Sequence, residues 1–315
     1  MTDLIIPVYK PDNKFKRLLE ALVSQTVKPD NILIMYTRTG EDDHFPPEFI
    51  ELAMAAGETR VFELDRTDFD HGGTRAEAVS HSGADIFIMM TMDAIPADDH
   101  LIENLIKHLS DPLTGAAYAR QLPDMDSSLA EKFTRGFNYP DGSVCKGKED
   151  LERLGIKTFF CSNVCAAYRR DVYDKLGGFI KRTVFNEDMI YAHKLIMNGY
   201  KICYEADAGV IHTHEYGPMQ QLHRNFDLAV SQAEHPEVFG SVSSESEGKR
   251  YLGQAFSYFK KAGKAYLIIP FFINCCFKYL GYLLGKNHKH LPYPFVRALA
   301  MNKGYFAAKN GGRKS

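Results

Sequence analysis

The sequence predicts an α/β fold, with a doubly wound, mainly parallel sheet of Rossmann-like type and a C-terminal helical extension. Three observations lead to this prediction. Short apolar runs alternate with segments whose apolar residues recur three and four positions apart, as in helices that cover a sheet. This alternation continues to residue 214. Beyond residue 216 the segments are helical, aromatic and basic, and no strand pattern returns.

The N-terminal part of the chain follows this order throughout. Strand-like and helix-like segments alternate over residues 3–9, 15–26, 31–37, 46–57, 59–65, 74–83 and 84–93. The last of them, ADIFIMMTMD, is apolar enough to be buried on both faces. Ligands of such sheets bind outside the carboxyl ends of the strands, so we expect the loops that follow these strands to share one rim. They are the loops after Tyr9, after Tyr36, around His71 and around Asp93.

The next part of the chain is less regular. Strands are expected in residues 115–123 and 201–214, a strand with a helix in 158–179, and a helix in 186–200. Between them lies a long polar segment with helical turns, residues 124–157, which we interpret as a lid or an insertion on the acceptor side. We place the domain boundary near residue 216, with a sheet domain over 1–216 and a helical extension over 217–315.

Composition excludes several classes of protein. The hydrophobic share of 45% and the charged share of 25% are typical of a folded globular chain. The net charge of −2 provides no positive field of the kind that nucleic-acid binders use, so we expect no nucleic-acid partner. The N-terminal apolar run has five residues, too few for the core of a signal peptide. The six cysteines include no CxxC pair, which indicates reduced thiols in a cytosolic setting and no zinc site.

One strand end and one turn are candidates for binding an anion. Asp93 follows the apolar run DIFIMM, where a carboxylate can hold a hard divalent cation. The turn HGGTR, residues 71–75, places a glycine pair at a helix start, where backbone N–H groups bind phosphate and Arg75 adds a guanidinium. The alternatives are helix capping near PADDHLIENL for Asp93 and a simple turn for the glycines.

An acidic pair and a histidine pair follow later in the chain. Glu187 and Asp188 open a predicted helix, where the helix dipole favours carboxylates, so first-turn capping is the alternative to a chemical role. His212 and His214 are two residues apart on a predicted strand and are expected to face the same side. Metal ligation, contact with a phosphate and a plain surface role all remain open for them.

Taken in order, these motifs resemble those of the inverting family-two glycosyltransferases, which have a GT-A fold. The resemblance covers residues 3–235. The segments that look most like bacterial rhamnosyltransferases of surface-polysaccharide assembly are DFDHGGTR, TMDAIPADD, NEDMIYAHKLIMNGYKICYEADAGVIHTHEY and HRNFD. The resemblance implies a cytoplasmic enzyme that transfers a sugar, L-rhamnose from dTDP-L-rhamnose, to a hydroxyl of a lipid-linked or polysaccharide acceptor. A UDP-hexose or UDP-N-acetylhexosamine donor, or a non-catalytic scaffold subunit of a polysaccharide assembly complex, are the alternatives.

The resemblance also assigns roles to residues. It implies that Asp188 is the general base and that Glu187 contacts the acceptor or orients the helix. The implied ligands of a divalent cation, Mg²⁺ or Mn²⁺, are Asp93 and a histidine, which is His212 by preference, with His214 as the alternative. The implied donor-binding residues are Pro7, Tyr9, Thr37, Gly73, Arg75, Thr91, Met92 and Asp93.

Three positions depart from the family pattern. Thr91 stands where the usual Asp-x-Asp motif has its first acid, so a metal requirement is less firmly implied. Ala76 follows Arg75 where the family has Asn. The turn YTRTGEDD replaces the acidic turn that contacts the nucleotide base, and leaves Thr37 and its neighbours as substitutes.

The C-terminal extension contains the apolar segment AYLIIPFFINCCFKYLGYLLGK, residues 265–286. Its length is close to what a bilayer core requires, but Pro270, Asn274 and Lys278 are expected to interrupt it. Basic residues flank the segment, as in helices that lie in the interface of an anionic leaflet. We therefore expect peripheral contact with the inner face of the cell membrane. The alternative is a helical cap packed on the sheet domain.

Overall fold

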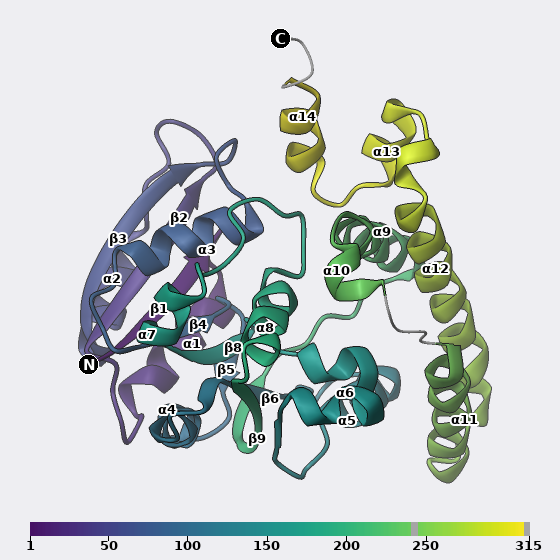
Figure 1. Cartoon of the computed structure of the whole chain (residues 1–315), viewed down its shortest axis with the longest axis horizontal. Helices are drawn as coiled ribbons and strands as arrows, with labels where there is room; N and C mark the ends of the chain where they lie inside the picture. Colours follow the sequence, from purple (N-terminus) through teal and green to yellow (C-terminus); the bar gives the residue numbers. More distant parts are fainter. Residues whose placement is uncertain (241–244, 312–315) are drawn as a thin grey trace. The chain divides into compact units, whose positions relative to one another are not determined.

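The protein is described by a computed structural model that covers residues 1–240 and 245–311. Its sheet has the strand order β3-β2-β1-β4-β8-β6-β9-β5 (Figure 1). Strand β7 pairs with β9. The strands are β1 (Thr2–Val8), β2 (Asn31–Arg38), β3 (Glu58–Asp65), β4 (Ile86–Met90), β5 (Ile95–Pro96), β6 (Thr114–Leu122), β7 (Val144–Lys146), β8 (Cys165–Arg169) and β9 (Lys201–Ile211).

Helices connect and flank these strands. The α-helices are α1 (Asn13–Val23), α2 (Pro47–Ala56), α3 (His71–Ser80), α4 (Leu101–Ile106), α5 (Leu129–Asn138), α6 (Leu151–Leu154), α7 (Arg170–Lys175), α8 (Glu187–Met197), α9 (Pro218–Glu234), α10 (Pro236–Phe239), α11 (Glu245–Lys261), α12 (Ile268–Lys286), α13 (Tyr293–Leu299) and α14 (Lys303–Gly311). Short 3₁₀ turns are η1 (Lys107–Ser110), η2 (Lys148–Asp150), η3 (Gly155–Phe159), η4 (Ala265–Leu267) and η5 (His288–His290).

Strands β3, β2, β1 and β4 form the parallel half of the sheet. Neighbouring strands run in the same direction, with Val8 opposite Tyr36 and Leu4 opposite Ile88. The apolar runs of β1 and β4 are buried, and the amphipathic helix α1 covers them with Phe15 and its other apolar residues. The predicted strand–helix alternation is confirmed here. Because the strands are parallel, their carboxyl ends lie along one edge of the sheet.

Strands β8, β6 and β9, with the short β5 and β7, form the mixed half. Strand β8 is antiparallel to both β4 and β6, whereas β6 and β9 are parallel. Strands β5 and β7 pair with β9 in antiparallel orientation. The prediction of a mainly parallel sheet is therefore confirmed, with β8 running in the opposite direction between β4 and β6.

The described chain divides into two compact units. The first comprises Met1–Asp124, Tyr139–Arg182 and Glu187–His212 and contains every strand of the sheet. The second comprises Met125–Asn138, Thr183–Asn186 and the described residues from Thr213 onward. Part of the predicted insertion, helix α5, belongs to the second unit. The predicted domain boundary near residue 216 stays a prediction.

The second unit is helical, as expected for the C-terminal extension. Helices α9 and α12 lie side by side (Figure 1). Their close contact requires glycine, since a Cβ atom at Gly281 or Gly285 would lie 2.3 Å from the carbonyl oxygen of Leu222 or Phe226. Helix α5 joins the same unit through Phe133, whose ring belongs to an aromatic cluster with residues of α11 and α12.

Helix α12 corrects one expectation about the apolar segment. Pro270 does not interrupt the helix, because α12 begins at Ile268 and the first turn of a helix tolerates proline. Within the described residues, the stretch Ala265–Lys286 is the one helix long and apolar enough to cross a membrane, with a mean hydropathy of 1.7 over its most apolar window. Only 11% of that window is buried.

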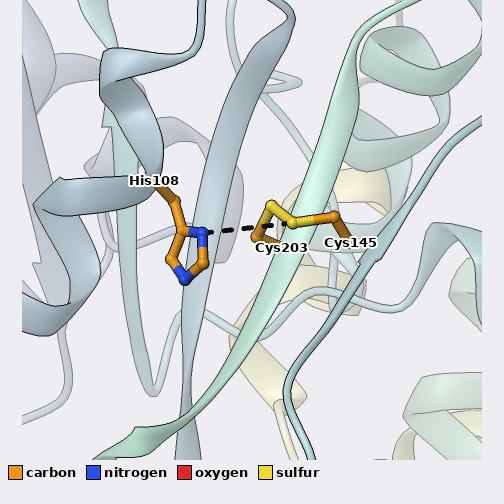
Figure 2. Close-up of side chains that lie close together, drawn as sticks. All are labelled: His108, Cys145 and Cys203. Carbon is orange, nitrogen blue, oxygen red and sulfur yellow. Dashed lines mark hydrogen bonds between the residues drawn. A yellow bond between two sulfur atoms is a disulfide. The ribbon is translucent and has the colours of Figure 1, made fainter.

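The cysteines correct another expectation. The sequence predicts six reduced thiols, but Cys145 on β7 and Cys203 on β9 form a disulfide (Figure 2). The prediction was wrong for this pair because the two residues are 58 positions apart, and only the pairing of β7 with β9 places them opposite each other. Cys161, Cys165, Cys275 and Cys276 are free thiols.

Candidate active site

The ends of β1 and β4 meet at the predicted rim. The Tyr9 N–H donates a hydrogen bond to the Met92 Sδ atom at 3.4 Å, which joins two of the predicted donor-binding residues. The neighbouring Thr91 N–H donates to the Val164 carbonyl oxygen at 3.0 Å. The Thr91 Oγ1 atom, in contrast, is buried and makes no hydrogen bond within the described part of the chain. A buried hydroxyl without a partner costs free energy, so this atom is available to a ligand.

Asp93 lies directly beyond Met92 and faces His212. The His212 Nε2 atom lies 3.5 Å from the Asp93 Oδ1 atom, and the aspartate side chain is 20% exposed. On the other side of the ring, His212 Nδ1 lies 3.0 Å from Gln121 Oε1, an acceptor. Gln121 therefore favours the tautomer with the proton on Nδ1, which directs the Nε2 lone pair toward the carboxylate.

The His212 Nε2 atom and the Asp93 carboxylate are both electron-pair donors, and their separation of 3.5 Å allows both to bind one cation. A histidine whose second nitrogen is held by an oxygen acceptor is the usual arrangement around a protein-bound metal. One imidazole nitrogen and carboxylate oxygens suit Mn²⁺ as well as Mg²⁺. His214 follows two residues later, in the second unit. The two histidines were predicted to face the same side because both were expected to lie on a strand. Strand β9 ends at Ile211, so neither histidine lies on it and this reason for a shared orientation does not apply.

The predicted glycine turn has a packing role in the structure. The Asp70 carboxylate caps α3 and accepts hydrogen bonds from the N–H groups of Gly72 and Gly73 at 2.9 and 3.0 Å. A Cβ atom at Gly72 would lie 2.0 Å from the Ile180 carbonyl oxygen, and one at Gly73 would lie 2.6 Å from that of Lys181. Glycine is thus required because two backbone segments approach closely, and contact between Gly73 and the donor stays a prediction.

Arg75 connects this turn to the acidic pair. Its guanidinium is buried, with Nε 3.3 Å from Glu187 Oε1, and its Nη1 atom donates to the His71 carbonyl oxygen at 2.9 Å. Glu187 also accepts a hydrogen bond from the Asn163 side-chain amide at 3.1 Å. The Asn163 backbone N–H donates to Asp188 Oδ2 at 3.0 Å. Asn163 therefore touches both acids, one through its side chain and one through its backbone.

The two neighbouring acids differ in protonation. Burial and the charge of Glu187 raise the pKa of Asp188 to about 7, because the N–H donors from Asn163 and Met189 offset only part of their effect. For Glu187, burial would raise the pKa, but the charges of Arg75 and His71 and the Asn163 amide lower it below its ordinary value. Glu187 thus stays ionised while Asp188 exchanges its proton near neutral pH. First-turn capping alone would not give two adjacent acids such different pKa values.

The remaining predicted donor contacts lie on β1 and β2. Pro7 is partly buried on β1, opposite Met35, and Thr37 is buried near the end of β2. In the turn that follows, the Asp43 carboxylate accepts hydrogen bonds from the Tyr36 hydroxyl and from Thr39, so this acid holds the turn together. Contacts of this region with a nucleotide base stay predictions.

Two residues of this site were missed in the sequence. Asn163 positions the acidic pair, and Gln121 positions His212. The Gln121 Nε2 atom in turn donates a hydrogen bond to the Ser162 hydroxyl at 3.0 Å. The available signal was the polar pair Ser162-Asn163 between two apolar runs in TFFCSNVCAAY, placed immediately before a buried strand.

The sequence profile described as Glycosyl transferase family 2 matches residues 3–177. The chain belongs to glycosyl transferase family 2. It is 39% identical over 308 residues to the O-antigen chain rhamnosyltransferase RfbN of Salmonella typhimurium, covering 96% of this chain and 95% of that protein. It is 34% identical over 310 residues to the O-antigen chain rhamnosyltransferase WbaN of Salmonella anatum, with the same coverage.

Solved glycosyltransferase structures share the fold. The mannosyltransferase PcManGT from Pyrobaculum calidifontis, in complex with GDP-Man and Mn²⁺, aligns with a TM-score of 0.55 and 17% identity, over 100% of this chain and 88% of that one. Residues 1–349 of TarS from S. aureus align with a TM-score of 0.52 and 12% identity, over 92% and 91% of the two chains. The expected GT-A fold is confirmed, and the family makes this chain a nucleotide-sugar-dependent glycosyltransferase.

Proposed function

We propose that this family-two enzyme moves L-rhamnose from dTDP-L-rhamnose, with inversion at the anomeric carbon, to a hydroxyl of a lipid-linked or polysaccharide acceptor of O-antigen type. The observation that carries the proposal is the 39% identity, over 96% of the chain, to a protein named an O-antigen chain rhamnosyltransferase. The acidic pair supports catalysis itself, and the alternative of a non-catalytic scaffold is set aside because the family is one of enzymes.

In this proposal Asp188 is the general base, and Glu187 contacts the acceptor or orients the helix. Asp188 takes the proton of the acceptor hydroxyl while that oxygen bonds to the anomeric carbon, and the bond to the nucleoside diphosphate breaks with its electron pair on the diphosphate. A base works best with a pKa near the working pH, and the pKa of about 7 of Asp188 meets this condition. Glu187 stays ionised beside Arg75 and helps keep the Asp188 pKa raised.

The donor is proposed to occupy the rim at the carboxyl ends of β1, β2 and β4. The proposed contacts are Pro7, Tyr9, Thr37, Gly73, Arg75, Thr91, Met92 and Asp93. Asp93 and His212, with His214, are proposed to hold Mg²⁺ or Mn²⁺. When bound, the cation stabilises the charge that develops on the departing diphosphate. Arg75 adds a guanidinium close to the turn at Gly73.

Donor binding tests the proposal directly. Titration calorimetry with dTDP-L-rhamnose, UDP-glucose and UDP-N-acetylglucosamine, each with Mg²⁺ or Mn²⁺, is expected to rank dTDP-L-rhamnose first. A UDP-sugar that binds more tightly would overturn the rhamnose assignment and favour the alternative of a UDP-hexose or UDP-N-acetylhexosamine donor. The family assignment would remain, because it rests on the whole sequence.

We also propose that the enzyme works in the cytoplasm, in peripheral contact with the inner face of the cell membrane. Large apolar side chains of α12 are exposed, namely Ile269, Phe272, Ile273, Tyr279, Leu280 and Leu283. Basic residues accompany them in the sequence at Lys260, Lys261, Lys264, Lys286, Lys289 and Arg297. An exposed apolar helix with basic residues before and after it in the sequence suits an anionic leaflet. Because α12 packs closely on α9 through Gly281 and Gly285, contact along the surface is favoured over a crossing.

Vesicle sedimentation tests the membrane proposal. The protein is expected to bind vesicles that contain anionic phosphatidylglycerol at low salt and to dissociate in high salt, because the Debye length shortens. Ile269→Ser with Phe272→Ser is expected to weaken binding. Leu113→Ser, at an exposed apolar residue of the sheet unit, is the matched control. Failure to bind, or binding that resists both salt and alkaline carbonate, would contradict peripheral contact.

A further inference from the structure

A cluster of sulfur and nitrogen atoms lies on the mixed half of the sheet, apart from the site at Asp93. Cys145 on β7 and Cys203 on β9 occupy directly opposed positions of an antiparallel pair. His108, in η1, lies against them with Nδ1 4.0 Å from Cys145 Sγ (Figure 2). The two Sγ atoms and a ring nitrogen of His108 all lie within 4.8 Å of one another. Three separate segments of the chain thus bring two sulfurs and an imidazole together.

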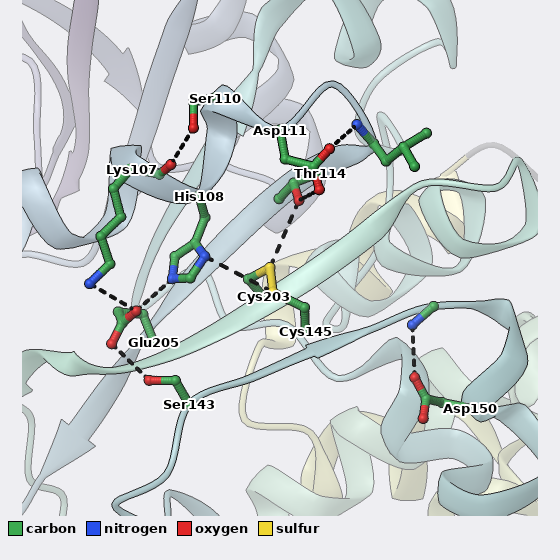
Figure 3. The surroundings of a disulfide bond; sticks show 12 residues. Lys107, His108, Ser110, Asp111, Thr114, Ser143, Cys145, Asp150, Cys203 and Glu205 are labelled. Atoms are coloured by element: carbon green, nitrogen blue, oxygen red, sulfur yellow. Dashed lines mark hydrogen bonds and ion pairs between the residues drawn. A yellow bond between two sulfur atoms is a disulfide. The ribbon is translucent and has the colours of Figure 1, made fainter.

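The imidazole is held in place by a buried carboxylate. His108 Nε2 lies 2.5 Å from Glu205 Oε2, and the Glu205 side chain is 3% exposed (Figure 3). Because an ionised carboxylate only accepts hydrogen bonds, Nε2 carries a proton, and in the neutral ring Nδ1 then presents its lone pair on the sulfur side. This carboxylate–histidine pair is the arrangement that orients metal-ligating histidines in proteins.

Glu205 is itself firmly held as a carboxylate. It accepts hydrogen bonds from the Ser143 hydroxyl at 2.8 Å and from the Asp207 N–H at 2.9 Å, and Lys107 Nζ lies 3.2 Å from it. These donors and the lysine ammonium surround the carboxylate, and the carboxylate in turn fixes the ring of His108.

We propose that Cys145, Cys203 and His108 form a zinc site in the reduced enzyme, which the disulfide closes on oxidation. Two thiolates and one imidazole make a donor set that Zn²⁺ prefers, with one position left for water. Cys203 is buried and Cys145 is exposed, so an ion can enter from the side of Cys145. The site differs in place and chemistry from Asp93 and His212, since Cys203 lies near the start of β9 and His212 follows its end.

The conversion balances in two steps. A dithiol reductant supplies two electrons and two protons, the sulfur–sulfur bond breaks to give two thiols, and the reductant becomes a disulfide. Binding of Zn²⁺ then releases the two thiol protons to solvent and forms two zinc–sulfur bonds. The reducing cytosol of the proposed function would favour the metal-binding form.

Cobalt binding tests the proposal without a transfer assay. The full chain is reduced with a dithiol, freed of it without air, and titrated with Co²⁺. We expect a thiolate-to-cobalt charge-transfer band and the strong visible bands of tetrahedral Co²⁺, both removed by one equivalent of Zn²⁺. Protein oxidised with diamide is expected to show neither.

Variants identify the ligands. Cys145→Ser, at an exposed position, is expected to lower Co²⁺ affinity by more than about a hundredfold, and Glu205→Gln by roughly ten- to a hundredfold, the range for partners of metal-bound histidines. Cys276→Ser, at the exposed free thiol, is the control and should show the thiolate-to-cobalt band at wild-type strength. Circular dichroism checks that each variant is folded.

Three results would overturn the proposal. The reduced wild type could bind Co²⁺ without a thiolate band, the band could persist at full strength in Cys145→Ser, or the disulfide could resist dithiol in the folded protein. The wild-type spectrum decides the matter even if a variant fails to fold. The outcome does not depend on the donor sugar, so failure here leaves the rhamnosyltransferase proposal intact.

Discussion

The two halves of the sheet present their carboxylates in different ways. In the parallel half, Asp93 follows the end of β4 at the edge where the strands end, and remains 20% exposed. In the mixed half, Asp188 opens α8 against a buried glutamate and the backbone of Asn163. One carboxylate is placed by the direction of its strand. The other is held by the backbone of Asn163, which lies 25 residues away in the sequence, and its pKa is raised by burial and by the charge of the adjacent Glu187.

The difference teaches which property each half supplies. The end of a parallel strand fixes where a carboxylate stands, and a cation requires little else of it than charge and access. A general base also needs a pKa near neutrality, which requires burial and a neighbouring charge. Asp188 has both from its surroundings. The predictions below test whether the two halves separate in this way.

Removal of the Asp93 charge is expected to have the largest effect. In the proposed mechanism, Asp93→Asn removes a cation ligand, and cation stabilisation of a leaving group contributes several kcal/mol, so turnover should fall about a thousandfold or more. Steady-state transfer at saturating donor and metal measures it. Asp99→Asn makes the same charge change at an exposed acid and should be near wild type. Near wild-type turnover of Asp93→Asn would remove this carboxylate from the mechanism.

Asp188→Asn is expected to lower turnover by roughly a hundredfold or more, the usual contribution of a general base. The dissociation constant of the donor should barely change, because the base acts on the acceptor hydroxyl. Paired measurements of donor affinity and transfer rate are needed, with Glu187→Gln for comparison. Equal and small effects on both variants would reduce the pair to helix capping, and a larger loss at Glu187 would assign the base to that residue.

The pH profile should show the raised pKa of Asp188 in the mixed half. The base must be ionised, so the transfer rate is expected to fall about tenfold per pH unit below about 7 and to level above it. The free energy of unfolding should change in the opposite direction. The unfolded chain loses the Asp188 proton near the ordinary pKa of aspartate, whereas the folded chain loses it near pH 7. The contribution of Asp188 to stability therefore declines as pH rises from about 4 to 7. Asp188→Asn should lack that decline. A rate that is flat between pH 5 and 8 would contradict the assignment.

In the parallel half, Gly72→Ala is expected to cost about 3 kcal/mol of unfolding free energy or more. The new Cβ atom would lie 2.0 Å from the Ile180 carbonyl oxygen, and backbone atoms cannot move aside as a flexible side chain would. Urea denaturation measures the change. Gly83→Ala is the matched control, since nothing lies within 4 Å of its added Cβ atom. Equal stability of the two variants would show that the segment at Ile180 moves freely.

Asn163→Ala is expected to lower the free energy of unfolding, and this is the smallest of the expected effects. It tests the contacts of the mixed half. It removes the amide donor of Glu187 and the acceptor of the Tyr168 hydroxyl, and a buried polar group without its partner costs about 1–3 kcal/mol. The backbone N–H that binds Asp188 is retained. Asn198→Ala, at an exposed amide near the end of α8, is the control. An unchanged midpoint of unfolding would mean that water replaces the side chain.

The sequence by itself determined the order of elements and the placement of the first carboxylate. Apolar runs and helical spacing are local properties, so the strands of the parallel half, the start of α8 at Glu187 and the position of Asp93 beyond β4 all followed from the pattern. Parallel strands joined by helices must present their carboxyl ends on one edge, which predicts that Tyr9 and Met92 lie close together, and the hydrogen bond between them agrees with this.

Only the tertiary structure decided which distant residues touch. Gln121 reaches His212 because β6 and β9 pair in parallel, with Leu122 opposite Ile211. Asn163, just before β8, reaches Asp188 on α8, and no local pattern encodes either contact. Cys145 meets Cys203 through the register of β7 on β9, and a shift of one residue would separate them. Periodicity fixes which face a side chain occupies, whereas a pKa, a disulfide or a metal site depends on distances of a few ångströms between separate segments, and those distances are set by packing.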